Sequence, residues 1–437
     1  MDPADLGVLD AARALRRKEL SSVELTEACL ARIHERDGSV NAWVRVYEED
    51  ALAAARRADA QPDRGAAPLL CGVPVGLKDL YAVAGKPLTA SSSVLHVVPR
   101  RSSTAWVRLR ARGMVLLGHL HTHEFAAGGT TDQVANPWAN DRTAGGSSGG
   151  SAAALAAGMT PAATGTDTAG SLRIPSALCA TSTIKPTRGL VPLRGIVPVA
   201  RALDHAGPMA RTVADCEPLL AALAGVEPAV ERTPFRRVAV SPRVGELDPD
   251  VAAGFEAAIA ALGRRVVSVP PPDLDLDVEA EHFDLLGAEM LDWHRRFDDR
   301  RADYRPSTRG YLEHAERRAL TPQRRAAIRR HRRRDAAAWT DWARANRVDA
   351  ILEPTVPIVA RRRGHGYDAP FSDLAEVSLT YYWDWTGFPV VALPSGVGSR
   401  SGLPTGVSLV GAPGSEWDLL AAGALLQDAL GGPPGRR

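Results

Sequence analysis

The chain has 437 residues, of which 45% are hydrophobic and 24% are charged, and its formal net charge is +2. This composition is ordinary for a globular protein, and so small a net charge gives no general attraction to nucleic acid or to a membrane. No apolar run reaches the length of a membrane span, and the first residues lack the pattern of a signal peptide. Four scattered cysteines without Cys-x-x-Cys spacing favour reduced thiols, so we expect a cytoplasmic protein.

The first part of the chain predicts helices. Ser22-Val23-Glu24-Leu25 is similar to a capping box and indicates a helix that ends near Asp37. A second helix is predicted from Glu48 to Ala60. Residues 1–65 are therefore expected to form a helical cover.

Short apolar runs between helical stretches then predict the strands of a buried sheet. They are Val73 to Leu77, Val115 to Leu117, Val238 to Val240, Val266 to Val269, Ala350 to Leu352 and Val390 to Leu393. The Ala-rich segment from Ser151 to Met159 indicates a buried helix that begins at a Gly-Ser loop. No linker or repeat divides residues 1–437, so we predict one α/β domain, an α/β/α sandwich with a large, mixed and twisted central sheet covered by helices.

A strongly basic helix is predicted from Thr321 to Asn346. Its arginines are Arg324, Arg325, Arg329, Arg330, Arg332, Arg333 and Arg334. A surface for RNA or an acidic partner is the alternative, but acids elsewhere neutralise the total charge and no aromatic residues interleave with the arginines. We therefore interpret the segment as a solvated helix with no nucleic-acid partner, whose inner face is packed by Trp339 and Trp342.

Two serines far apart in the sequence are flanked by glycines. One lies in Gly145-Gly146-Ser147-Ser148-Gly149-Gly150-Ser151 and the other in Asp167-Thr168-Ala169-Gly170-Ser171-Leu172-Arg173. Glycine lets the backbone approach a substrate closely, which makes both hydroxyls candidates for catalysis. Serine is a weak nucleophile near neutral pH and needs a neighbouring base.

A lysine can supply that base. The only lysines among 53 basic residues are Lys18, Lys78, Lys86 and Lys185, and arginine cannot act as a base at working pH. Lys78 ends the apolar run that begins at Gly72. Burial there disfavours the ammonium form, so Lys78 is the candidate base.

These motifs resemble the amidase signature family, whose members use a Ser, cis-Ser and Lys triad. The matching features are Lys78-Asp79 after a strand, the Gly-Ser loop, the Asp-Thr-x-Gly-Ser-x-Arg-x-Pro run and the interval of 24 residues between the two serines. The resemblance covers most of the chain and is densest from Gly72 to Thr212. It implies that Ser171 is the nucleophile, that Ser147 is the bridging serine after a cis peptide bond, and that Lys78 is the base. It also implies a signature core at about residues 66–212 and a variable substrate-pocket region at about 270–382.

The resemblance implies a cofactor-independent hydrolase of small-molecule amides, with aryl amides, esters and carbamates as further candidate substrates. In the expected reaction, neutral Lys78 takes the proton of Ser147 while Ser147 takes that of Ser171. Backbone N–H groups of a tight turn are suited to the oxyanion, and Ser148 is expected to position the substrate or the loop. The candidate oxyanion donors are Thr168, Ala169, Gly170 and Ser171. No metal and no membrane are expected, and the protein is expected to be a monomer or homodimer.

The main alternative is a glutamine-amidase subunit of the complex that modifies aminoacyl-tRNA. Ala169 stands where the family often has glycine and Ser408 where it commonly has glutamine, and both departures weaken that assignment. A run of aromatic residues close to Gly387 either walls the substrate pocket or packs the core. These residues are Tyr381, Tyr382, Trp383 and Trp385.

Three other patterns offer weaker alternatives. Gly145-x-Ser147-x-Gly149 fits the nucleophile elbow of α/β-hydrolases, but Trp138 to Thr143 before it has the pattern of a loop. Ser182-x-x-Lys185 fits the signature of penicillin-binding enzymes, but the chain has no Lys-Thr-Gly. Alternating histidines would face one side of a strand and could bind zinc, although the family has a non-metal strand and loop there. They are His119, His121 and His123, and His205 is expected to have a structural or site-supporting role.

Overall fold

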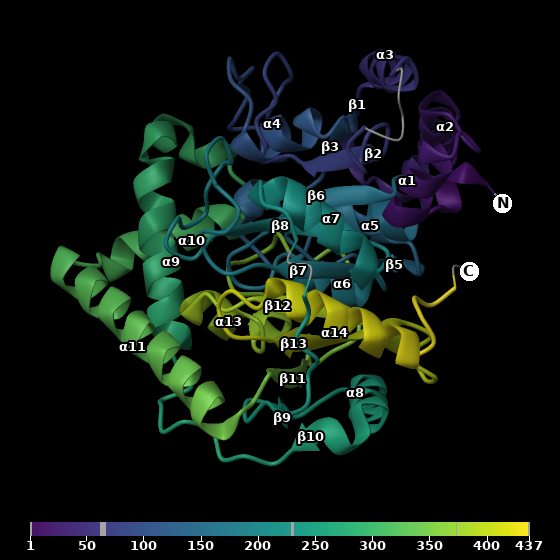
Figure 1. Ribbon diagram of the computed structural model, residues 1–437. Coiled ribbons are helices and arrows are strands. Elements are labelled where there is room, and N and C mark those ends of the chain that lie inside the picture. The colour runs from purple at the N-terminus through teal and green to yellow at the C-terminus, as the bar shows by residue number, and fades with distance from the viewer. Residues whose placement is uncertain (1, 62–66, 229–230, 373, 436–437) are drawn as a thin grey trace.

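A computed structural model describes residues 2–61, 67–228, 231–372 and 374–435. Its centre is an 11-stranded mixed sheet in the order β1-β3-β2-β6-β8-β7-β12-β13-β11-β9-β10, flanked by helices (Figure 1). The strands are β1 (Trp43–Val46), β2 (Pro74–Lys78), β3 (Val115–Leu120), β6 (Ala162–Asp167), β7 (Ser182–Lys185), β8 (His205–Ala210), β9 (Val238–Val240), β10 (Val266–Val267), β11 (Ala350–Pro354), β12 (Val390–Val397) and β13 (Pro404–Val410). The predicted helix-covered α/β sheet is confirmed.

Helices surround this sheet and come from every part of the chain. They are α1 (Val8–Arg16), α2 (Ser22–Val40), α3 (Glu48–Asp59), α4 (Thr104–Ala111), α5 (Gly149–Ala156), α6 (Arg173–Leu178), α7 (Val213–Ala224), α8 (Pro249–Leu262), α9 (Glu279–His294), α10 (Pro306–Arg318), α11 (Pro322–Asn346), α12 (Leu374–Val377), α13 (Tyr381–Thr386) and α14 (Glu416–Ala429). In the part of the chain that the structure describes, none of them is both long and apolar enough to cross a membrane.

The predicted N-terminal helices form, with one shift. The capping box joins Ser21, rather than Ser22, to Glu24, because the Ser21 hydroxyl accepts the Glu24 N–H and the Glu24 carboxylate accepts the Ser21 N–H. The helix continues to Val40, where Asn41 ends it in the left-handed conformation.

Two central strands, β6 and β8, are not predicted from the sequence. Every residue of both strands is buried, yet β6 reads Ala-Ala-Thr-Gly-Thr-Asp and has no run of large apolar residues. The two strands pair antiparallel, with Gly165 opposite Gly207. A Cβ atom on Gly165 would lie 2.8 Å from Ser148 Oγ and 2.6 Å from Leu172 Cδ2. Small residues are therefore needed here because the loops of the site pack directly on the strand.

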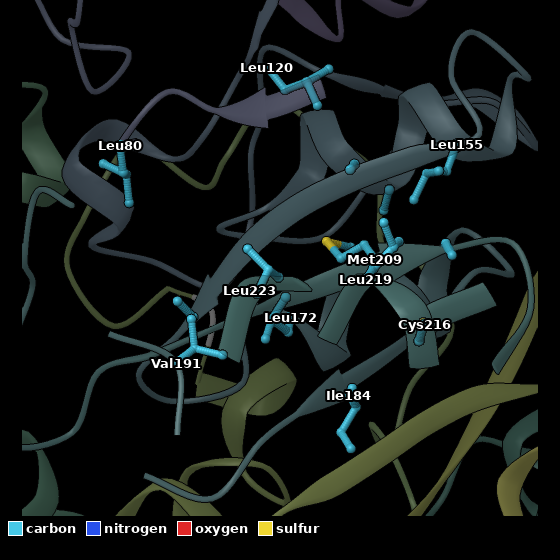
Figure 2. Packing of buried hydrophobic residues seen from close by; sticks show 14 of the residues in the cluster. Leu80, Leu120, Leu155, Leu172, Ile184, Val191, Met209, Cys216, Leu219 and Leu223 are labelled. Atoms are coloured by element: carbon cyan, nitrogen blue, oxygen red, sulfur yellow. The ribbon is translucent and has the colours of Figure 1, made fainter. Parts of the chain in front are cut away.

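The core beside these strands is filled by aliphatic side chains of the neighbouring elements. Figure 2 shows Met209 of β8 next to Leu219 of α7, with Leu155 of α5 and Leu172 on opposite sides of them in the same buried cluster. All four side chains are almost fully buried. This packing fixes the strand that precedes Ser171 and the helix that follows Ser147.

The segment from Trp138 to Thr143 is not the predicted loop. β4 (Ala135–Asn136) and β5 (Ala139–Thr143) pair in a separate two-stranded sheet. The sequence hides β5 because its residues are mostly polar and at least partly exposed, so they lack a buried apolar face. A strand does precede Gly145-x-Ser147-x-Gly149, but it lies outside the central sheet that a nucleophile elbow requires.

The basic segment forms the predicted long helix, α11, capped by the Thr321 hydroxyl. Several of its arginines pair with acidic residues of α9, which lies beside it on one side of the molecule (Figure 1). The pairs are Arg324 with Glu281, Arg325 with Asp292, and Arg329 with Glu289. On the inner face, Trp339 is buried and donates to the Tyr382 hydroxyl at 2.9 Å, as the packing prediction requires.

Candidate active site

Lys78 lies at the end of β2, an inner strand of the sheet between β3 and β6, and its side chain is fully buried. Its Nζ atom lies 2.7 Å from Ser147 Oγ, 2.8 Å from Ser148 Oγ and 2.9 Å from Thr166 Oγ1. A neutral amine has two N–H donors and one lone pair, so three hydroxyl partners can satisfy all of them. The geometry lets Lys78 accept one hydroxyl proton while it donates two hydrogen bonds.

The surroundings of Lys78 favour this neutral form. Burial lowers the pKa of Lys78 well below its usual value of 10.5, and the charges of Asp167 and Asp204 oppose this shift. The Asp167 carboxylate, however, is held by the Arg173 guanidinium. The described structure pairs Lys78 with hydroxyls and with no carboxylate, so little stabilises a buried ammonium.

Ser147 lies in the loop that leads into α5, and the Gly146–Ser147 peptide bond is cis. The carbonyl of Ser147 accepts the backbone N–H of His123 and the hydroxyl of Thr131, each at 3.1 Å. Both bonds come from segments outside the loop. They fix the serine that contacts Lys78.

Ser171 lies in the turn between β6 and α6. The Asp167 carboxylate accepts the backbone N–H of Gly170 at 2.6 Å and that of Leu172 at 3.1 Å, so it holds the turn on both sides of Ser171. The Arg173 guanidinium donates to both oxygens of this carboxylate at 2.9 Å. The pKa of Asp167 is lowered because the attraction of Arg173 outweighs the effect of burial.

Two further hydroxyls hold the same turn. Thr168 Oγ1 donates to Asp204 at 2.8 Å, and Thr380 Oγ1 donates to the carbonyl of Ala169 at 2.5 Å. Gly170 adopts φ +135°, and a Cβ atom there would lie 2.2 Å from Thr380 Oγ1. The turn therefore requires glycine at this position for both its backbone conformation and its packing.

The candidate oxyanion donors separate into two groups. The N–H of Gly170 already donates to Asp167, which corrects the expectation that it is free for a substrate. Among the described residues, the backbone N–H groups of Thr168, Ala169 and Ser171 have no acceptor. These three remain available to a substrate oxygen.

Of the two roles expected for Ser148, positioning the substrate or the loop, its contacts fit the second. Its hydroxyl is buried, bonds to Lys78 and donates to the carbonyl of Thr166 at 3.3 Å. Its backbone N–H donates to the carbonyl of Ser171 at 3.3 Å. Ser148 thus joins the two serine loops and holds the lysine, while its side chain does not line the substrate pocket.

Ser171 lines a small pocket and is 8% exposed. Within the described chain its hydroxyl has no hydrogen-bond partner, so it is available for reaction. The other lining residues come from the turn, the segment after His123, Val199 and the helices α9, α10 and α12. They are Ala126, Ala127, Gly128, Gly129, Thr168, Ala169, Val199, Phe283, Leu286, Tyr311, Leu374 and Val377.

The aromatic residues of α13 pack the core instead of walling this pocket. Trp383 and Trp385 are fully buried, and their indole N–H groups donate to Glu353 and Asp335 at 2.6 and 2.8 Å. Tyr381 and Tyr382 do not line the pocket either. The aromatic residues that do line the pocket are Phe283 and Tyr311. The sequence does not single them out, because a lone aromatic residue in a helix looks like any residue of the hydrophobic core.

A buried network of charges lies behind the turn, and sequence reasoning missed most of it. Arg173 Nη2 lies 2.6 Å from Asp384 Oδ2, and His205 Nδ1 lies 3.1 Å from Asp384 Oδ1. Burial lowers the pKa of His205 well below its usual value of 6.5. His205 thus has the site-supporting position expected of it. Asp384 is concealed in the sequence by the aromatic residues around it.

The alternative assignments are not assembled in the structure. Lys185 donates to the carbonyl of Phe388 at 2.5 Å, whereas the Ser182 hydroxyl accepts from Gln427 at 3.0 Å, so the Ser-x-x-Lys pair does not meet. Burial lowers the pKa of Lys185 to about 7. Because its amine bonds to a backbone carbonyl and the Ser182 hydroxyl bonds elsewhere, this second buried lysine has a structural position.

The three alternating histidines also diverge. His119 bonds to the Tyr47 hydroxyl and the carbonyl of Tyr81, whereas the side chain of His121 lies 3.1 Å from Ser91 Oγ. The ring of His123 lies against Tyr367. Over the described ranges, no group of three or more His, Cys, Asp or Glu side chains could hold a metal ion. His119 lies near the end of β3, whereas His121 and His123 follow that strand, and each histidine contacts a different part of the protein.

The profile of the amidase family, described as Amidase, matches residues 24–420. The chain belongs to the amidase signature family. It is 36% identical to the A subunit of glutamyl-tRNA(Gln) amidotransferase from Roseiflexus castenholzii, and the match covers 97% of this chain and 95% of the relative.

Solved structures of other members have the same fold as this amidase signature protein. One belongs to an unexpected vestigial protein complex that reveals the evolutionary origins of an s-triazine catabolic enzyme; its TM-score is 0.87 at 30% identity, with 99% of this chain and 100% of that chain covered. Another is 6-aminohexanoate cyclic dimer hydrolase, with a TM-score of 0.87, 28% identity and 98% of each chain covered. The family and these neighbours support amide hydrolysis as the general activity.

Proposed function

We propose that this protein hydrolyses small-molecule amides through an acyl-enzyme on Ser171, with Lys78 as the base and Ser147 as the proton relay. The observation that carries the proposal is the buried Lys78 amine, whose Nζ atom lies 2.7 Å from the hydroxyl of Ser147. The loop of Ser147 is bonded to the turn of Ser171, because the backbone N–H of Ser148 donates to the carbonyl of Ser171. Burial supplies the neutral amine that a base requires.

The proposed reaction proceeds in two balanced stages. Ser171 Oγ attacks the amide carbon, its proton passes to Ser147, and the proton of Ser147 passes to Lys78. The backbone N–H groups of Thr168, Ala169 and Ser171 stabilise the oxyanion. Lys78 and Ser147 return a proton to the leaving nitrogen as the C–N bond breaks. Water then attacks the Ser171 ester and gives its proton to Ser147 and Lys78. The relay returns a proton to Ser171 Oγ as the ester C–O bond breaks and the carboxylic acid leaves.

The same steps extend the proposal to aryl amides, esters and carbamates, because each has a carbonyl carbon that Ser171 Oγ can attack. The buried free thiols of Cys29, Cys179 and Cys216 support the proposed cytoplasmic location. We also propose a monomer or homodimer built from one domain. Its signature core lies at about residues 66–212, and the variable region at about 270–382 supplies substrate contacts.

The proposal is tested with a p-nitroanilide substrate and a fluorophosphonate that labels activated serines. Ser171→Ala and Lys78→Ala should each lower kcat/KM by about 10²-fold to 10⁴-fold, since each removes a group of the relay. Ser171→Ala should also abolish labelling. Lys86→Ala is the matched control, because Lys86 is a partly exposed lysine that pairs with Asp50.

A second candidate function is the glutamine-amidase subunit of an amidotransferase, which is favoured by the name of the 36% identical relative. The purified chain alone decides between the two. Turnover by the isolated chain supports the first function. Turnover of glutamine that begins only when a second subunit is added, with none by the isolated chain, would replace it.

A further inference from the structure

In the part of the chain that the structure describes, the wall of the pocket beside Ser171 has no charged group. Among the described residues that line it, every side chain is either apolar or a neutral hydroxyl. Phe283 and Leu286 of α9, Tyr311 of α10, and Leu374 and Val377 of α12 make the outer wall.

Charged residues near this wall are bound to other parts of the protein. The Arg243 guanidinium donates to the carbonyls of Ser378 and Leu379 at 2.8 and 2.7 Å. The Glu376 carboxylate accepts the Arg361 guanidinium. The Arg243 and Glu376 charges are therefore already bonded within the protein. A charged ligand group could bind either one only by competing with these protein partners.

Two more charges lie behind the turn of Ser171 and are also paired. Asp204 accepts the Thr168 hydroxyl and the backbone N–H of Ala200. Arg173 is fully buried between Asp167 and Asp384. Neither residue lines the pocket. A ligand with separate positive and negative groups therefore meets no matching charge in the described wall.

This wall decides which acyl group the site can hold. Glutamine has an ammonium and a carboxylate beyond its side-chain amide, and both would lose water in the pocket without a partner. Unpaired charge is much more costly to bury than any neutral group, whereas apolar groups gain from the same burial. Because the acyl group stays bonded to Ser171 after the amine leaves, the pocket that Ser171 lines must accommodate it.

We propose that the substrate of this protein has an uncharged, apolar acyl group, aryl or branched alkyl, and that the zwitterionic acyl group of glutamine is excluded. This inference rests on the proposed role of Ser171. Phe283 is the main specificity-determining side chain, because it lines the pocket and is fixed between the rings of Tyr381 and Phe371, each 6.2 Å away.

Two p-nitroanilides that differ only in the two groups at the fourth carbon of the acyl chain test the inference. 4-Methylpentanoyl-p-nitroanilide ends in two methyl groups at the carbon where γ-glutamyl-p-nitroanilide has an ammonium and a carboxylate, and the leaving group is the same. We expect kcat/KM to be at least about 100-fold higher for the methyl compound, since the unpaired charges must be desolvated. Equal values, or a higher value for the γ-glutamyl compound, would overturn the substrate class and leave the Ser171 chemistry standing.

A second readout does not need turnover. 4-Methylpentanamide should slow the labelling of Ser171 by a fluorophosphonate at a much lower concentration than glutamine does. Better protection by glutamine would overturn the inference. Failure to label Ser171 at all, together with no turnover of either anilide, would instead overturn the proposed function, so the two failures are distinguishable.

Variants of the pocket rim add a direct test of charge. Leu374 is partly exposed and lines the pocket, so Leu374→Arg should be tolerated and should reduce the preference for the methyl compound at least tenfold. Leu374→Met changes the shape without charge and should keep the preference. A preference that is unchanged in Leu374→Arg would contradict the role assigned to the uncharged wall.

Discussion

At the scale of single residues, the burial of Lys78 has opposite effects on protein stability and on the proposed catalysis. Folding must remove its amine from water, and this is unfavourable for the protonated form. Catalysis in the proposed mechanism needs the neutral form that burial produces. Three hydroxyls contact the amine, and they can bond to it without stabilising charge as a carboxylate would. The chemistry of the site is therefore linked to protein stability through one pKa.

This linkage predicts how stability depends on pH. The pKa of Lys78 is lower in the folded protein than in the unfolded chain, so between the two values the unfolded chain binds the extra proton. The free energy of unfolding then rises with pH, by up to about 1.4 kcal/mol per pH unit from this residue. In urea titrations at about pH 7 and about pH 9, the wild type should gain more stability than Lys78→Met.

The variant Lys86→Met controls for loss of a lysine, because Lys86 is partly exposed and pairs with Asp50. It should show the same gain as the wild type. Lys185, whose pKa is also lowered, is present in all three proteins, so its contribution cancels. An equal gain in Lys78→Met and the wild type would show that Lys78 is not neutral in the folded state.

Single residues also mark how far sequence reasoning reaches into the site. Lys78, Ser147 and Ser171 are recognisable because rare lysine and glycine-flanked serine leave local signals. Thr380 and Asp384 are not recognisable. They reach the turn of Ser171 only because α13 packs against it, more than 200 residues later in the chain. Such long-range contacts have no local pattern.

At the scale of elements, the turn from Thr168 to Ser171 is held from several sides at once. Asp167 binds its backbone, Asp204 binds the Thr168 hydroxyl, and Thr380 binds the carbonyl of Ala169. In the proposed mechanism this turn supplies the oxyanion donors, whose value depends on fixed direction. Its rigidity is therefore part of its proposed chemical role.

Gly170→Ala should damage that turn. Its added Cβ atom would meet Thr380 Oγ1 at 2.2 Å, and its φ of +135° is unfavourable for alanine. We expect kcat/KM to fall at least about 100-fold, as when an oxyanion donor is lost. Steady-state kinetics with an anilide, together with circular dichroism to verify folding, measure the effect.

Gly189→Ala is the matched control. Gly189 also has a positive φ, of +88°, but nothing lies within 4 Å of a Cβ atom placed there. It should cost only about 1 kcal/mol of stability and leave kcat/KM unchanged. If Gly170→Ala behaved like Gly189→Ala, the packing of Thr380 against the turn would be irrelevant to activity.

The elements also show which parts of the fold can be predicted. Strands rich in valine are found from the sequence: β9 matches its predicted bounds, Val238–Val240, whereas β10 ends at Val267 rather than Val269 and β12 continues to Val397 rather than Leu393. β6 and β8 could not be found, since alanine and glycine, together with threonine in β6 and proline in β8, give them no run of large apolar residues although they are fully buried. Their small residues are chosen by the loops that pack on them. Where the loops of the site must approach a strand closely, packing rather than the strand propensity of single residues determines the sequence.

At the scale of the whole molecule, distant segments are joined by a few buried polar groups. Gln427 of α14 accepts the backbone N–H of Val213 at 2.9 Å and donates to the Ser182 hydroxyl at 3.0 Å. One side chain near the end of the chain thus fixes the start of α7 and the start of β7. Both elements pack against β8, which pairs with the strand that leads to Ser171.

Gln427→Ala should therefore reduce global stability. It leaves a buried N–H and a buried hydroxyl without this partner, and an unsatisfied group costs about 1 to 3 kcal/mol. Urea unfolding followed by tryptophan fluorescence gives the free energy. Gln323→Ala on exposed α11 should change it by less than about 0.5 kcal/mol, and an equally small change in Gln427→Ala would contradict the structural role.

The wall of the pocket and the pair of Lys78 and Ser147 come from separate parts of the fold. α9, α10 and α12 supply Phe283, Tyr311 and Leu374, whereas β2 and the loop before α5 supply Lys78 and Ser147. Substitutions in the wall can therefore accumulate without disturbing the proton relay. For directed evolution, this makes the three helices the natural target of a mutant library: new acyl groups can be selected there while the reactive centre is inherited unchanged.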